Sequence, residues 1–385
     1  MGPTIADARE LLEWRPLLGV VSVYLAIDPA DRGGAWQTRL RNGLGELVAA
    51  GNGREHDLRV ALKATAERVA ERFAESDRSN LPRGQVGFVE VSGSRGEERW
   101  WATHLPPLSP ATAYLSAIPV LAPLVGLVGL AGPRGVAILS AERVRLFERV
   151  PGHLEELRDW ELSLTSGDWR ERNAPAVADP ARSSSVSASG HDQFDERLAA
   201  NRRRFLCECG RLARQAGSER AWPRILAFGS PPDVAHFRDG IPSSSSPSLE
   251  NGAAVDLISE PAGVLREQVE QAFARIDAER DRRLVERVLE ETQSGSRGTA
   301  GVQETAAALA EGRVECLVLA GGLAPLVAPF DARPGPDPAD DGYVSAGSEP
   351  LVRRALHSGA EVTVVAEEAA GLLEPFDGVA ALLRY

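Results

Sequence analysis

The sequence predicts an α/β protein with three domains, on the strength of three observations. The first is its length, because 385 residues suffice for two or three domains of ordinary size. The second is its composition, with 43% hydrophobic and 25% charged residues, which is normal for a globular protein that buries a core. The third is that short apolar runs alternate with apolar residues at helical spacing along most of the chain, which is typical of mixed folds.

Residues 1–160 are predicted to form a mixed α/β N-terminal domain. The run from Val20 to Ile27 is nearly all apolar and ends at Asp28-Pro29, as expected of a buried strand that is closed by a turn. Further apolar runs follow, and between them apolar residues recur at the spacing of one helix face. Strands are expected at residues 20–27, 86–91, 99–104, 135–139 and 143–149, and helices at residues 36–50 and 55–74.

Residues 161–190 are predicted to be a linker or an exposed loop, because they are rich in Ser, Ala and Pro and lack periodicity. The middle domain is predicted to span residues 191–280. It begins with a helix from about Asp192 to Gln215, which has an apolar stripe and many arginines beside it. Strands are expected at residues 224–229 and 253–258, and a long helix after Pro261.

Residues 281–385 are predicted to form a small α/β/α domain, because helix and strand alternate there. Residues 331–348 are rich in Pro, Asp and Gly and are expected to form a loop. The helices are expected at residues 302–311 and 350–357, and the strands at residues 316–319, 361–365 and 379–383.

Several classes of protein are disfavoured by what the sequence lacks. No run of 18 apolar residues is present, and no basic segment followed by an apolar run opens the chain. Three cysteines without a pairing pattern fit a reducing compartment, and the six histidines have no metal-ligand spacing. No phosphate-binding loop or dinucleotide fingerprint occurs. We therefore expect a cytoplasmic protein with no metal, no other cofactor and no membrane contact.

The charge is distributed unevenly. The net charge of −12 argues against general binding of nucleic acids, and DNA is not expected as a partner. Residues 191–220 have the opposite sign, because they hold seven Arg against five Asp or Glu. The arginines of interest are Arg197, Arg202, Arg203 and Arg204. They are either contacts to RNA phosphates or a solvated helix face, and both interpretations stay open.

Two stretches near the C-terminus carry a resemblance. "VLEETQSGSRGTAGVQETAAALAEGRVECLVLAGG" (288–322) and "FDGVAALLRY" (376–385) resemble the third domain of archaeal and eukaryotic class-I release factors and Pelota. The second phrase is similar to the bacterial branch of this family, which includes release-factor-like and peptidyl-tRNA-hydrolase-like proteins and the hibernation factor Balon. The resemblance is strong over residues 260–385, moderate over 185–260 and weak before 150. It implies an RNase-H-like middle domain.

The resemblance also gives a role to the start of the arginine-rich helix. In this family a Gly-Gly-Gln loop precedes such a helix, and its glutamine positions water against the ester that joins peptide to tRNA. The resemblance therefore implies that Gln193 is the catalytic residue. It further implies a loop tip of Gly190, His191 and Asp192, and RNA contacts from Arg197, Arg202, Arg203 and Arg204.

The loop tip departs from the family pattern. At best one glycine of the pair is retained, and it is displaced by two positions. His191 adds bulk, and Asp192 adds a negative charge where the tRNA end would approach. Asp192 is also a good N-cap for a helix that starts at Gln193 or Phe194, so this stretch could be an ordinary helix start.

We expect from these observations a translation factor that binds the ribosomal A site through rRNA, in hibernation or rescue, without hydrolysing peptidyl-tRNA. A tRNA and a translational GTPase are further candidate partners. Two alternatives stay open: a peptidyl-tRNA hydrolase that uses Gln193, and a protein-interaction module that never meets the ribosome.

Overall fold

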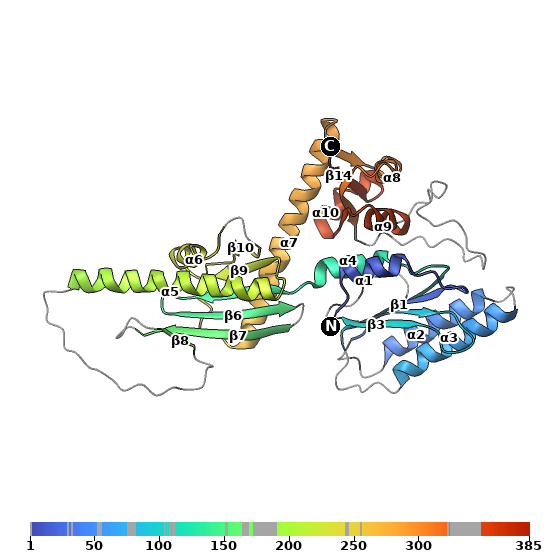
Figure 1. Cartoon of the computed structure of the whole chain (residues 1–385), viewed down its shortest axis with the longest axis horizontal. Helices are drawn as coiled ribbons and strands as arrows, with labels where there is room; N and C mark the ends of the chain where they lie inside the picture. The colour runs from blue at the N-terminus through green and yellow to red at the C-terminus, as the bar shows by residue number, and fades with distance from the viewer. Residues whose placement is uncertain are drawn as a thin grey trace. The chain divides into compact units, whose positions relative to one another are not determined.

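A computed structural model describes most of the chain, and it divides by contacts into two compact units (Figure 1). Residues 1–131 and 275–385 together form one unit, called here the split unit, and residues 132–274 form the central unit. Helices and strands alternate throughout, which confirms the predicted α/β class. The residues outside the description are 1, 29–30, 32–33, 52–55, 75–81, 104, 106, 108, 110–111, 151–152, 164–168, 172–190, 243–245, 255, 322 and 324–347.

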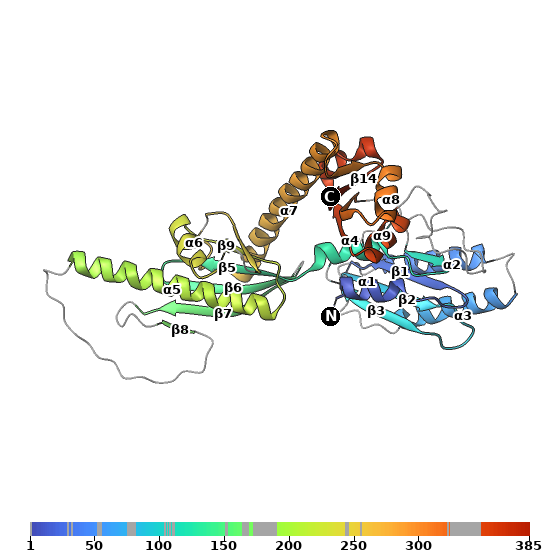
Figure 2. The same cartoon turned by 45° about the horizontal axis from the view of Figure 1, so that its top comes forward.

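The N-terminal sheet of the split unit is antiparallel, with the strand order β3-β2-β1-β4. Successive side chains of a strand point to opposite faces, so Val21 and Val23 pack with the helices of one face and Val20 with those of the other. Helices α2 and α3 cover the first face, and α1 and α4 lie on the second (Figure 2). The strands are β1 (Val20–Ala26), β2 (Gly84–Glu90), β3 (Glu98–Thr103) and β4 (Ala113–Ser116), and the helices are α1 (Ile5–Leu12), α2 (Ala35–Ala50), α3 (His56–Ala74) and α4 (Ala122–Ala131).

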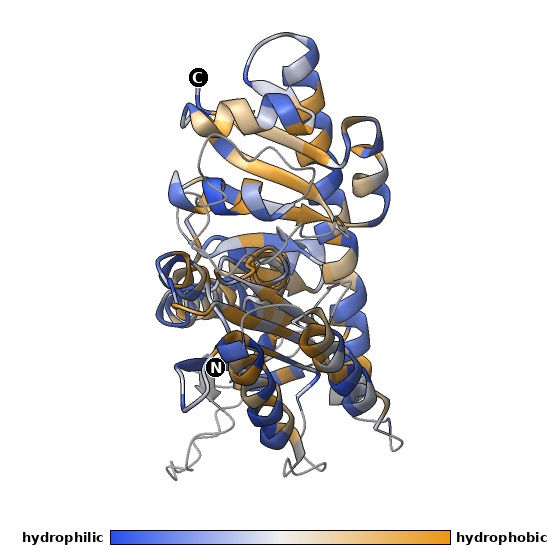
Figure 3. Ribbon diagram, turned by 90° about the vertical axis from the view of Figure 1, so that its right-hand side faces the viewer, coloured by the Kyte–Doolittle hydropathy of each residue, from blue (hydrophilic) through white to orange (hydrophobic). Residues whose placement is uncertain are grey.

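The C-terminal sheet of the split unit lies between two layers of helices, as the predicted α/β/α domain requires. Its strand order is β11-β14-β12-β13, with β12 and β13 parallel and β14 antiparallel to β12. Helices α8 and α9 share a core with one face, and α10 and the end of α7 with the other. The strands near the C-terminus are coloured orange, for apolar residues, as expected of strands covered on both faces (Figure 3). The elements are α7 (Ala262–Gln293), β11 (Gly298–Ala300), α8 (Val302–Ala310), β12 (Val314–Ala320), α9 (Ser348–His357), β13 (Glu361–Val365), α10 (Glu367–Gly371), η2 (Glu374–Phe376) and β14 (Val379–Leu383).

A buried ion pair on α9 connects the two chain segments of the split unit. Both carboxylate oxygens of Glu349 accept hydrogen bonds from the backbone N–H of Leu121, at 2.8 and 2.9 Å, and one also accepts from Ala122 at 2.8 Å. Arg353, one turn later, donates to the carbonyls of Pro119 and Leu12 at 3.1 and 3.2 Å. Burial raises the pKa of Glu349, and this outweighs the lowering by Arg353 and the amides. The carboxylate thus caps the start of α4, and the guanidinium caps the end of α1.

The central unit contains one six-stranded sheet with the order β10-β9-β5-β6-β7-β8. Strands β5, β6 and β7 form an antiparallel meander, and β9 and β10 are added in parallel on the other side of β5. This is the arrangement of an RNase-H-like domain. Helices α5 and α6 pack on one face and the first half of α7 on the other. The bounds are β5 (Arg134–Leu139), β6 (Arg143–Val150), β7 (His153–Leu162), β8 (Trp169–Glu171), α5 (His191–Glu219), β9 (Arg224–Phe228), α6 (Pro231–Arg238) and β10 (Ser248–Asn251).

The structure corrects three expectations from the sequence. The boundary at residue 160 cuts through the central sheet, because β5 pairs with β9. Within the expected linker 161–190, Trp169–Glu171 forms β8 against β7. The expected strand at 253–258 is not one in its described residues, and β10 takes the place beside β9 instead. The expected loop at 331–348 lies outside the described residues apart from Ser348.

Candidate nucleic-acid interface

The part of α5 before Phe205 has no buried side chain among its described residues. None of the residues from Glu196 to Arg204 is buried, and the first buried side chain is that of Phe205. We call residues 191–204 the α5 arm. The helix has 29 residues, which corresponds to about 43 Å, so the arm is about half of its length. Figures 1 and 2 show the arm extending past the strands of the central sheet.

The second half of α5 is held firmly in the central unit. Phe205, Leu206 and Cys209 are buried in the core beneath the sheet face. Two glycines allow α5 and α6 to approach closely: a Cβ on Gly210 would lie 2.1 Å from the carbonyl oxygen of Phe237, and a Cβ on Gly240 2.1 Å from that of Cys207. A rigid base therefore supports an arm that has no core of its own.

Arg202 is engaged within the fold. Its Nη2 donates to the carboxylate of Glu142 in the turn between β5 and β6. The side chain is 36% exposed, and its Nε is buried without a hydrogen-bond partner among the described residues. This arginine fixes the base of the arm to the sheet and offers little to an outside ligand.

The neighbouring arginines face outward. Arg203 reaches Asp239 at 3.2 Å, but both side chains are about half exposed or more, so this ion pair contributes little. Arg197 and Arg204 are exposed, and neither forms an ion pair with a described residue. Of the four expected RNA contacts, two guanidinium groups thus have no ion-pair partner among the described residues, a third is weakly paired and the fourth is engaged.

A polar stripe runs along the exposed side of α5. Arg197, Asn201, Arg204, Glu208 and Arg211 recur at spacings of four and three, so they share one face. Arg211 donates to both oxygens of Glu208 at 3.0 and 2.6 Å and lowers the pKa of that carboxyl. The one acid on the stripe is therefore neutralised by its neighbour, and the stripe is positive.

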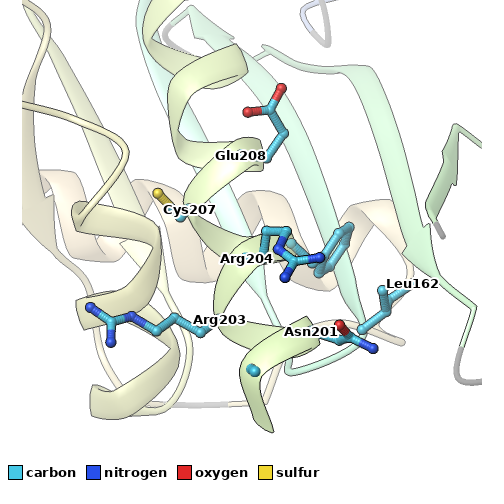
Figure 4. Close-up of a pocket in the computed structure, with 8 residues that line it drawn as sticks. Leu162, Asn201, Arg203, Arg204, Cys207 and Glu208 are labelled. Atoms are coloured by element: carbon cyan, nitrogen blue, oxygen red, sulfur yellow. The ribbon is translucent and has the colours of Figure 1, made fainter. Parts of the chain in front are cut away.

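A surface cleft of about 540 Å³ runs along α5, because seven of its eight lining residues belong to this helix and the eighth is Leu162 at the end of β7. Figure 4 shows Arg204 and Asn201 turned toward Leu162, the last residue of β7, and Arg203 turned to the other side of the helix with Cys207. Phe205 contributes an apolar part of the lining. Sequence reasoning missed Asn201, Leu162 and Glu142. Asn201 could have been found from its helical spacing, because it lies four residues after Arg197 and three before Arg204. No local signal in the sequence points to Leu162 or Glu142.

The expected catalytic loop falls partly outside the described residues. Gly190 lies outside them, whereas His191, Asp192 and Gln193 belong to the first turn of α5. The helix starts within two residues of Gln193, as predicted, but it starts too early for Asp192 to be its N-cap. His191 and Asp192 are thus helical and not a loop tip. The described residues offer no group of three or more His, Cys, Asp or Glu side chains that could hold a metal ion, and none of their helices is long and apolar enough to cross a bilayer.

The negative charge of the chain is concentrated away from α5. Residues 132–274 hold 18 Arg against 21 Asp or Glu, whereas residues 275–385 hold 11 Arg against 19. The central unit is therefore close to neutral, and its positive stripe is not opposed by a strongly acidic background.

Comparison with known proteins gives one sequence family and several distant structures. Residues 119–274 match the bacterial archaeo-eukaryotic release factor family 10. No curated protein matches the chain. The archaeal translation termination factor aRF1 is 16% identical, with 100% of this chain and 99% of that chain covered and a TM-score of 0.26. Archaeoglobus fulgidus Pelota is 12% identical, with 100% of this chain and 93% of that chain covered and a TM-score of 0.33. S. cerevisiae Dom34 is 9% identical, with 78% of this chain and 80% of that chain covered and a TM-score of 0.38. TM-scores this low do not establish a common arrangement of the whole chain.

Proposed function

We propose that this chain binds the ribosome in the A site and that the α5 arm is its contact to RNA, because residues 119–274 match the bacterial archaeo-eukaryotic release factor family 10. The family match covers the whole central unit, which carries the arm. In this proposal the protein acts in hibernation or rescue and does not hydrolyse peptidyl-tRNA. A tRNA at the same site and a translational GTPase are proposed as further partners.

The observation that carries this proposal is the unpacked arm with its open arginines. None of the side chains from Glu196 to Arg204 is buried, so this part of α5 gains little from packing and offers its surface to an external partner. Arg197 and Arg204 present two guanidinium groups on the same face, with no ion pair to a described residue. Phosphate oxygens are among the ligands that such groups bind strongly.

The absence of hydrolysis is proposed from the start of α5. Gln193 belongs to the first helical turn, and the residues before it in that turn are His191 and Asp192 in place of two glycines. Water held against an ester needs a donor aimed at the developing oxyanion and close approach of the tRNA end. A bulky side chain and a carboxylate oppose both requirements.

Ribosome pelleting tests the proposal. Purified protein is centrifuged with ribosomes from growing and from starved cells over a range of salt concentrations. Arg197→Gln with Arg204→Gln should weaken co-sedimentation and reduce the salt slope by about two units, because each phosphate contact contributes about one. The matched control is Arg266→Gln with Arg287→Gln, which removes two exposed arginines of α7 and should leave binding unchanged. Equal binding of the α5 variant and the wild type would refute the proposed contact.

A further inference from the structure

The cleft beside α5 suits a ligand more specific than a phosphate. We propose that it holds one unpaired RNA nucleotide, so that the central unit prefers single-stranded RNA to duplex RNA. This inference rests on the proposed function in one respect only, which is that RNA is the partner of α5.

The size and the walls of the cleft fit a nucleotide. Its volume of about 540 Å³ leaves room for a base and its ribose on an open surface of the helix. Leu162 from β7 and Phe205 from α5, which are 5% and 2% exposed, form its apolar floor, so a base would pack mainly against Ala200 and the aliphatic stem of Arg204. A site for phosphate alone would need neither the volume nor the apolar lining.

Two polar side chains at the cleft are free to bind. Asn201 and Arg204 lie one turn apart and both turn toward Leu162 (Figure 4). Neither has a hydrogen bond or ion pair with another residue in the described part of the chain. The amide of Asn201 both donates and accepts, which matches a base edge or a ribose 2′-hydroxyl, and the guanidinium of Arg204 matches the phosphate.

Glu208, the one acid among the described residues that line the cleft, does not repel a phosphate there. Glu208 accepts both of its side-chain hydrogen bonds from Arg211, at 3.0 and 2.6 Å, so its charge is compensated on the helix. Arg197 lies seven residues before Arg204, which is about 10 Å along the helix. It can therefore contact a phosphate further along the same strand.

The geometry favours a single strand. In duplex RNA the bases are stacked inside the helix, and the deep, narrow major groove excludes side chains, so no base can enter a cleft on a protein surface. An unpaired nucleotide can turn its base into the cleft while its phosphates stay on the arginine face. Duplex RNA would contact only Arg197 and Arg204.

The experiment measures the affinity of the full-length protein for RNA by fluorescence anisotropy, without ribosomes. The probes are a short labelled oligouridylate, a duplex RNA of the same length, and inorganic polyphosphate as competitor. We expect the single strand to bind at least about tenfold more tightly than the duplex. Asn201→Ala should lower the affinity for the single strand about fivefold, the value of one hydrogen bond, and leave competition by polyphosphate unchanged. Arg204→Gln should weaken both and reduce the salt slope by about 0.7.

The controls separate this inference from the proposed function. Arg266→Gln should change none of these values, and Asn201→Ser serves as a second variant if Asn201→Ala loses its circular dichroism spectrum. Equal affinity for single strand and duplex, or an Asn201→Ala variant that binds like the wild type, would overturn the nucleotide site even if ribosomes are still pelleted. Retained binding of the single strand with no ribosome pelleting would instead overturn the proposed function and leave the nucleotide site standing.

Discussion

Replacing Glu349 by alanine should destabilise the split unit strongly while leaving the central unit intact. The variant removes the acceptor for the N–H groups of Leu121 and Ala122 and leaves the guanidinium of Arg353, which is 1% exposed, without its carboxylate. Breaking a buried ion pair by removing one partner costs about 3–5 kcal/mol. The equilibrium constant for unfolding should therefore rise by a factor of about 10² to almost 10⁴.

Two cysteines allow each unit to be measured separately. Cys316 is buried in β12 of the split unit, and Cys209 is buried in α5 of the central unit. Thiol labelling over a urea series, read by mass spectrometry, therefore reports the opening of both units in one sample. In Glu349→Ala the labelling of Cys316 should shift to lower urea, and that of Cys209 should not move.

A surface pair and a double variant complete the test. Glu67→Ala removes the exposed pair with Lys63 in α3, at 4.0 Å, and should cost at most about 0.5 kcal/mol. Glu349→Leu with Arg353→Met replaces both charges by apolar groups and should be less destabilised than Glu349→Ala. If Cys316 becomes reactive at the same urea concentration in Glu349→Ala as in the wild type, the reasoning about the buried pair is wrong.

Three further predictions concern the core, the pH dependence and catalysis. Gly210→Ala should destabilise the central unit by about 1–3 kcal/mol, because its Cβ would meet the backbone of Phe237. Gly263→Ala is the control and should not destabilise the unit, because no atom lies within 4 Å of its Cβ. Labelling of Cys209 over a urea series measures the stability of both variants. Burial raises the pKa of Cys316 from 9.0 to about 11, so the split unit should lose stability as the pH rises between these values, where only the unfolded thiol is ionised. Urea midpoints at pH 8 to 11 check this, and Cys316→Ala should flatten the curve. Gln193→Ala should bind ribosomes like the wild type, and neither should release peptide from ribosome-bound peptidyl-tRNA; rapid release that depends on Gln193 would show that the protein is an enzyme.

Apolar runs made most of the fold predictable from the sequence. Strands β1, β12 and β14 appear where such runs were recognised, because strands buried on both faces need apolar residues at nearly every position. Strand β7 was missed, since its sequence HLEELRDWEL carries five charged residues. One of them, Asp159, is buried, but Arg143 of the neighbouring strand holds it at 2.8 and 2.9 Å. Such a partner on another strand cannot be recognised from the local sequence.

The candidate site was predictable only as a region. The helical spacing placed the arginines off the apolar stripe, and the charge of residues 191–220 set them apart from the rest of the chain. Their separate roles depend on residues far away in the sequence, because Glu142 engages Arg202 and Asp239 pairs with Arg203. Whether Gln193 acts as the resemblance implies stays a prediction, since only its place in the first turn of α5 is described.

The division of the chain into units sets an order for its folding during synthesis. The central unit is one continuous segment, residues 132–274, so all of its strands have been made before α8 and α9 exist. The core of the split unit joins Val20 and Leu124 to Leu351 and Leu383, so it cannot close until the last residues have left the ribosome. Until then the apolar face of the N-terminal sheet has no cover from α9. A nascent chain of this protein therefore carries a finished central unit between two segments of a split unit that is still incomplete. Truncation near the C-terminus should expose the first of these segments to aggregation and proteolysis.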